Sequence, residues 1–148
     1  MPLVSMPKQA VQPATPWPAL LVRSDQGSVL IVADLHIGFE HSLSESGMSI
    51  PSQMPKLLKR LEEVIDRYRP QKLLFLGDVK HGIPSISDYE WEEIPIFFEK
   101  LLKRISDITV VPGNHDGDLE PLLPREVKLA DVTGIRSVSY THLTLPTN

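Results

Sequence analysis

The chain contains no cysteine, no long apolar run and only a small excess of negative charge. The absence of cysteine excludes disulfides, thiolate zinc sites, iron–sulfur clusters and cysteine nucleophiles, and it is compatible with a reducing, cytoplasmic location. No apolar stretch approaches the roughly 20 residues that cross a membrane, so no membrane partner is expected. The formal net charge of −4 argues against a broad basic surface for nucleic acid. These features still permit a local acidic pocket that acts on phosphate.

The 148 residues are enough for one domain with an apolar core. Residues 1–18 are rich in proline and small side chains, which predicts a flexible or extended arm. Residues 19–24 and 28–33 are apolar and flank a short segment with a glycine, so they predict a β-hairpin. The sequences at 72–77 and 108–113 are continuous apolar runs ending in glycine, as in strands buried on both faces of a parallel sheet.

Two segments between these strands have apolar residues at helical spacing. The first spans 52–69 with Ser52 as a candidate N-cap, and the second spans 88–105. Pro95 lies inside the second pattern and predicts a kink or two short helices. The resulting order, β-β-α-β-α-β, predicts an α/β fold with a mostly parallel sheet, flanking helices and ligands bound beyond the carboxyl ends of the strands.

Polar side chains interrupt the sequence at three of these strand ends. The first break contains Asp34 and His36, the second contains Gly77, Asp78, Lys80 and His81, and the third contains Gly113, Asn114, His115 and Asp116. Each break alone resembles an ordinary turn. Together they place oxygen and imidazole ligands, without sulfur, at the edge of one parallel sheet. Such ligands suit Mn²⁺, Fe²⁺, Zn²⁺ or Ni²⁺, and two such ions roughly 3.5–4 Å apart are the usual machinery for hydrolysing a phosphoester.

The strings "ADLHIGFE", "GDVKHGIPS" and "GNHD" resemble the calcineurin-like metallophosphoesterase superfamily over about residues 19 to 125. The first two strings are similar to a prokaryotic branch related to the SbcD-type repair nuclease, which includes archaeal phosphoesterases and bacterial ligase-associated enzymes. The resemblance implies half of a metallophosphoesterase β-sandwich, with two divalent ions, manganese being preferred over iron, zinc or nickel.

The resemblance also implies a role for each site residue. Asp34 and His36 would bind the first metal ion, Asp78 would bridge both ions, and Asn114 would bind the second. His115 would be the catalytic histidine, supported by Asp116, and His81 would meet the scissile phosphate. Glu40 lies four residues past His36 and is expected to be solvated.

The similarity stops after "GNHD". The family carries a second half with a lone histidine and a Gly-His-x-His motif, and neither is found here. We therefore expect residues 19–136 to be the N-terminal part of the domain and 137–148, which include His142, to be a non-native tail. The intact protein is expected to be a hydrolase of phosphodiesters or phosphomonoesters, with a nucleic acid or nucleotide among its candidate substrates, and this fragment would be impaired. The alternative is an inactive binding or scaffold protein of the same fold; the sequence indicates no protein partner.

Overall fold

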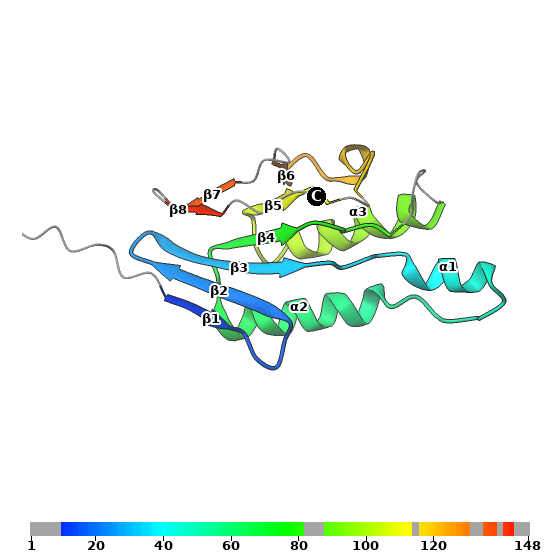
Figure 1. The fold of residues 1–148 in the computed structure, drawn as a ribbon, viewed down its shortest axis with the longest axis horizontal. Helices are drawn as coiled ribbons and strands as arrows, with labels where there is room; N and C mark the ends of the chain where they lie inside the picture. The colour runs from blue at the N-terminus through cyan, green and yellow to red at the C-terminus, as the bar shows by residue number, and fades with distance from the viewer. Residues whose placement is uncertain (1–9, 82–87, 114–115, 131–134, 139–140, 144–148) are drawn as a thin grey trace, which may run out of the picture.

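The computed structural model describes residues 10–81, 88–113, 116–130, 135–138 and 141–143. Its elements in chain order are β1 (Ala10–Pro13), β2 (Ala19–Ser24), β3 (Gly27–Ala33), α1 (Phe39–Glu45), α2 (Met54–Tyr68), β4 (Lys72–Leu76), α3 (Asp88–Leu102), β5 (Ile108–Val111), a short 3₁₀ helix (Glu120–Leu122), β6 (Lys128–Leu129), β7 (Ile135–Val138) and β8 (Thr141–Leu143) (Figure 1). Within this part of the chain, no helix has the length and apolar character needed to cross a membrane.

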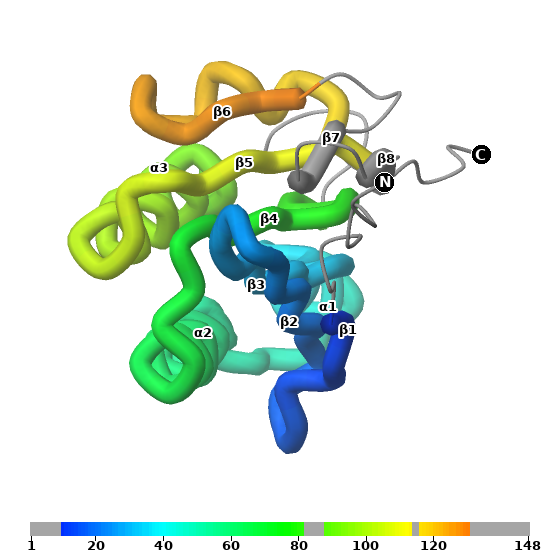
Figure 2. The backbone as a smooth tube through the Cα atoms, turned by 90° about the vertical axis from the view of Figure 1, so that its left-hand side faces the viewer, coloured from blue at the N-terminus to red at the C-terminus, as the bar shows by residue number. Residues whose placement is uncertain are grey.

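Six strands form one mixed sheet in the order β1-β2-β3-β4-β5-β6, and β7 and β8 form a separate antiparallel pair. The β2–β3 hairpin is antiparallel, as predicted, while β3–β4, β4–β5 and β5–β6 are parallel. Helices α2 and α3 lie on the same face of the sheet (Figure 2), and α1 lies beyond the end of β3 (Figure 1). The predicted α/β class with a mostly parallel sheet is therefore confirmed.

The structure differs from the sequence-based expectation in the N-terminal arm. Residues 10–13 form the edge strand β1, paired with β2, and Ala14 is fully buried. Part of the segment expected to be a flexible or extended arm therefore lies in the sheet as an extended strand. The backbone hydrogen bonds of residues 10–13 are made with β2, a distant partner that a proline-rich composition does not predict.

The helices also depart from the expected pattern. Helix α3 runs without a break through Pro95, so the prediction of two short helices is wrong. An internal proline costs about 3 kcal/mol, but Ile94, Phe97 and Phe98 are fully buried and their packing offsets that cost. Helix α2 begins one residue later than expected, with Gln53 and not Ser52 at the N-cap. Helix α1 was not predicted because its seven residues are too short for an apolar period.

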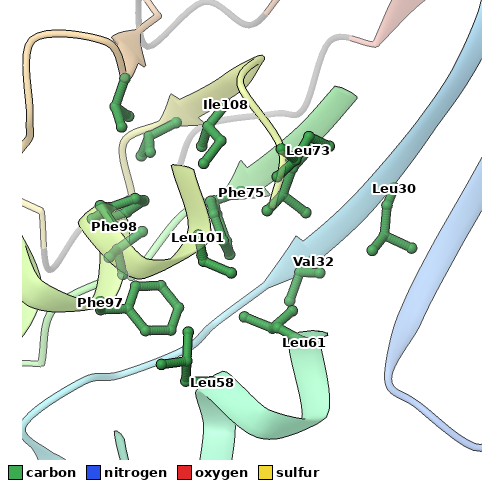
Figure 3. Close-up of a cluster of buried hydrophobic side chains, with 14 of the residues drawn as sticks. Leu30, Val32, Leu58, Leu61, Leu73, Phe75, Phe97, Phe98, Leu101 and Ile108 are labelled. Carbon is green, nitrogen blue, oxygen red and sulfur yellow. The ribbon is translucent and has the colours of Figure 1, made fainter. Parts of the chain in front are cut away.

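The main core lies between the sheet and helices α2 and α3 (Figure 3). Phe75 of β4 packs edge-on against Phe98, with ring centroids 5.6 Å apart, and Phe97 packs against Phe98 at 5.3 Å. Leu58, Leu61, Val64 and Ile65 of α2 face the same core. This packing fixes the strands, and the strands in turn place the loops at their carboxyl ends.

A second, smaller apolar cluster contains Val22, Val29, Ile31, Leu74 and Val111. Cross-strand pairing places Val11 beside Val22 and Leu20 beside Ile31, on the same side of the sheet. Val11 is 63% exposed and Leu20 is 44% exposed. This sheet face therefore presents uncovered apolar surface at its β1–β2 edge.

The fold predicts different consequences for two truncations in α3. Replacing the fully buried Phe98 with alanine should lower the free energy of unfolding by about 3–5 kcal/mol, because it removes an aromatic ring from a packed interior. Ile96, in the same helix, is 37% exposed, so Ile96→Ala should lower the free energy of unfolding by less than about 1 kcal/mol. Urea unfolding of both variants measures the difference. Equal losses would show that α3 does not pack as described.

Candidate metal centre

The loops that follow β3 and β4 run side by side beyond the ends of their strands. The backbone N–H of Asp34 donates to the carbonyl of Gly77 at 3.2 Å, and that of His36 donates to the carbonyl of Asp78 at 2.9 Å. Further along, Ile37 bridges to Lys80 in the same parallel direction. The pairing of the two strands thus continues into the loops and fixes the register of their polar side chains.

Asp34, His36 and Asp78 come together in this paired region. Each offers one ligand atom, and the three atoms lie within 4.8 Å of one another. All three residues have left-handed backbone conformations, with φ of 54°, 47° and 50°. Five non-glycine residues in the described part of the chain have positive φ, and Asp34, His36 and Asp78 are three of the five. Such backbone costs about 1–3 kcal/mol per residue and concentrates at functional sites.

The loop after β5 packs against this pair through glycine. A Cβ atom built on Gly113 would lie 2.6 Å from both the backbone nitrogen and the Oδ1 atom of Asp78, and 2.8 Å from the Cα atom of Gly77. Only a residue without a side chain permits this approach. Gly113 therefore brings the start of the third loop against Asp78.

Asp116 joins the second and third loops. Its Oδ2 atom accepts the backbone N–H of Gly113 at 2.8 Å, and its Oδ1 atom accepts that of Lys80 at 3.1 Å. Burial raises the pKa of the Asp116 carboxyl; the two hydrogen bonds oppose that shift, while the nearby charge of Asp78 adds to it. Asp116 thus helps to hold the loops around Asp78, a role that the sequence did not suggest.

His81 lies beside the three converging residues. Its Nδ1 atom is 3.4 Å from Nδ1 of His36, and Phe39 packs edge-on against its ring. One of the two Nδ1 atoms must donate and the other must accept. If His36 used Nε2 as a ligand and donated from Nδ1, its ring would be oriented by His81, as is usual for metal-binding histidines.

The donor set fits a divalent cation. Two carboxylates held this close repel each other, and a cation between them offsets that repulsion. The combination of two oxygens and one imidazole nitrogen suits Mn²⁺, Fe²⁺ or Zn²⁺ better than it suits a soft, thiolate-preferring ion. Asp34 is exposed while His36 and Asp78 are half-buried, so the site has an open side.

The remaining predicted residues have different outcomes. Asn114 and His115 lie outside the described residues. Glu40, expected to be solvated, is instead 5% exposed, and its Oε1 atom accepts the backbone N–H of Gln53 at 2.9 Å. That contact ties α1 to the start of α2, because Gln53 is the N-cap of α2. Lys80 is 1% exposed. Its burial was not predicted, because nothing in its sequence context indicates that a lysine is buried.

A sequence model of the calcineurin-like phosphoesterase family matches residues 27–144. The chain belongs to this family. The match includes the three strand-end loops described above, so the family's domain is the part of the chain that holds the converging residues.

The fold of this phosphoesterase domain is also similar to a solved structure, the crystal structure of Pseudomonas putida nuclease MPE. The TM-score is 0.54 at 18% sequence identity, and the match covers 88% of this chain and 63% of the nuclease chain. The chain thus spans less than two thirds of that relative's length. The comparison with curated proteins gives no match.

Two glycines of the third loop provide a matched test of the site. Gly113→Ala should weaken Mn²⁺ binding by at least about 10-fold, because the new methyl group displaces Asp78 and outer contacts of metal ligands are worth 10–100-fold. Gly117→Ala should leave the affinity unchanged, since no atom of the described residues lies within 4 Å of its Cβ position. Calorimetric titration with Mn²⁺ measures both affinities. Equal affinities in the two variants would contradict the close approach at Gly113.

Proposed function

We propose that the protein hydrolyses phosphoester bonds at a dinuclear metal centre, with Asp34 and His36 on the first ion, Asp78 between the ions and Asn114 on the second. The observation that supports this proposal is the convergence of Asp34, His36 and Asp78 on strained backbone at the carboxyl ends of adjacent parallel strands. Manganese is the preferred ion, and iron, zinc or nickel are alternatives with the same ligand chemistry.

When bound, the ions supply a Lewis acid for the phosphoryl group and an activated water as nucleophile. The chain's own residues position the reactants. Gly113 lies against Asp78 on one side and the paired loop of His36 lies on the other, and this confinement supports the proposed bridging role of its carboxylate. His81 lies beside His36, with their Nδ1 atoms 3.4 Å apart, and this position supports its proposed contact with the scissile phosphate.

His115 is proposed to protonate the leaving group or to steady the charge on the phosphate. Asp116 would support it in two ways. Its bonds to the backbone N–H groups of Gly113 and Lys80 anchor residue 116, which directly follows His115 in the sequence. Its carboxylate offers about four lone-pair sites, and the backbone N–H groups of Gly113, Lys80 and Val79 use three, so one remains to accept a hydrogen bond from the imidazole.

The substrate class proposed is a phosphodiester or phosphomonoester, with nucleic acid or a nucleotide as the candidates. The fold similarity to a nuclease and the sequence resemblance to the SbcD-related branch support that choice. A scaffold protein without chemistry is less well supported, because it would not need three potential ligands on strained backbone.

We further propose that residues 19–136 are the N-terminal part of a larger domain. Val11 and Leu20 are exposed on the sheet face where a second layer would pack, and the match covers 63% of the nuclease chain. A second half would add histidine ligands to the ions. Sequencing the gene past codon 136 tests this: a Gly-His-x-His motif supports it, and a stop codon after residue 148 contradicts it.

Replacing the proposed bridging carboxylate should affect both binding and turnover. Asp78→Asn should weaken Mn²⁺ binding by at least about 10-fold and lower kcat on bis(p-nitrophenyl) phosphate at least as much, since it removes a charge that both ions share. The exposed Asp118→Asn is the matched control and should retain both properties. The assignment fails if Asp118→Asn loses as much Mn²⁺ affinity as Asp78→Asn.

The proposed role of His115 separates chemistry from metal binding. His115→Ala should lower kcat by about 10²–10⁴-fold, the usual contribution of a general acid, while the metal content stays unchanged. Metal analysis beside kcat on esters with good and poor leaving groups distinguishes the roles. A loss confined to the poor leaving group supports the acid, and an equal loss supports a phosphate contact. A variant stripped of metal would show that His115 is a ligand.

A further inference from the structure

A cavity of about 120 Å³ opens next to Asp34 on the helix-covered side of the sheet. One wall is the segment Trp17–Ala19, the floor is the end of β3 with Val32 and Leu35, and the opposite wall is α2. Val32 and Leu61, which both line it, lie next to each other in Figure 3. Most of the lining side chains are apolar, so the cavity attracts an apolar group.

The walls are held in place before any ligand binds. Residues 14–19 form a tight loop. The backbone N–H of Trp17 donates to the carbonyl of Ala14 at 2.9 Å, and the backbone N–H of Ala19 donates to the carbonyl of Trp17 at 2.8 Å. The Trp17 ring packs edge-on against Tyr68 of α2, with centroids 6.3 Å apart. A cavity with fixed walls loses little entropy when it binds a rigid group.

Helix α2 lines the cavity with three apolar side chains and one arginine. Leu57, Leu61 and Val64 line the cavity at helical spacing, and Arg60 lies between them. Arg60 is exposed and forms no ion pair with any described residue. Its methylene stem therefore extends the apolar rim while its guanidinium stays in water, as long basic side chains commonly do.

We propose that this cavity binds a single six-membered aromatic ring carried by the phosphoester substrate, as in aryl phosphoesters or pyrimidine nucleotides. This inference rests on the proposed function, because it assumes that the phosphoryl group lies at the metal centre. Asp34 belongs to both sites: its carboxylate converges with His36 and Asp78, and the residue also lines the cavity. A substrate with a charged end and an apolar ring matches this arrangement.

The volume sets the size of the group. An engineered apolar cavity of about 150 Å³ in another protein binds benzene. A cavity of about 120 Å³ accommodates one such ring, and a fused two-ring base would extend from its open side into solvent. The cavity therefore fits a monocyclic substituent better than a bicyclic one.

Binding of two phosphonates of equal charge tests the proposal without turnover. With Mn²⁺ present, phenylphosphonate should bind the 148-residue chain at least about 10-fold more tightly than methylphosphonate, and 1-naphthylphosphonate should lose that advantage. Calorimetry measures the three affinities. A Trp91→Phe background leaves Trp17 as the single indole, and its emission should change with phenylphosphonate and not with methylphosphonate.

Two variants fill the cavity from opposite walls. Leu57→Phe and Ala19→Leu should each abolish the preference for phenylphosphonate while methylphosphonate still binds. Leu102→Phe is the control for Leu57→Phe, because Leu102 is also a partly buried helical leucine packed on the main core but does not line the cavity. It should keep the preference.

The outcomes distinguish the two proposals. If both phosphonates bind with equal affinity, the ring site is wrong and the phosphate site stands. If the phenyl preference survives both filling variants, the ring binds elsewhere and the inference is overturned. If neither phosphonate binds to the metal-loaded chain, this chain has no phosphate site beside the cavity and the inference is overturned, while the function proposed for the larger domain is tested separately by Asp78→Asn.

Discussion

The parallel pairing of β3 with β4, continued into the loops beyond them, is the constraint on which the site depends. Backbone bonds from Asp34 to Gly77 and from His36 to Asp78 set the two loops in register. The apolar core fixes the strands, but it does not by itself bring polar side chains together. The extended pairing does so, because each bond determines which residue of one loop faces which residue of the other.

The third loop completes this arrangement by contact and not by pairing. Gly113 lies against Asp78, and Asp116 accepts hydrogen bonds from the backbone of its own loop at Gly113 and of the second loop at Lys80. The strain of the left-handed residues is thus balanced by hydrogen bonds that surround them. A rigid cluster of donors is what metal-assisted phosphoester hydrolysis requires, since catalysis there consists largely of positioning and charge stabilisation.

The helices contribute more than cover. Helix α2 carries apolar residues both into the main core and around the cavity beside Asp34, so one amphipathic surface serves stability and the proposed recognition of an aromatic ring. Glu40 connects α1 to the start of α2 through Gln53. This hydrogen bond connects the segment between His36 and α2 to the helix that lines the cavity.

Periodicity along the chain was enough to predict the α/β class, the hairpin and the parallel strands, and polar residues at the strand ends predicted that Asp34, His36 and Asp78 lie close together. Only the folded chain shows that β1 joins the sheet, that α3 continues through Pro95, that Glu40 is buried and that Asp116 links two loops. Each of these depends on groups distant in sequence that meet only on folding. Hydrogen-bond partners and packing, unlike periodicity, are properties of the folded chain.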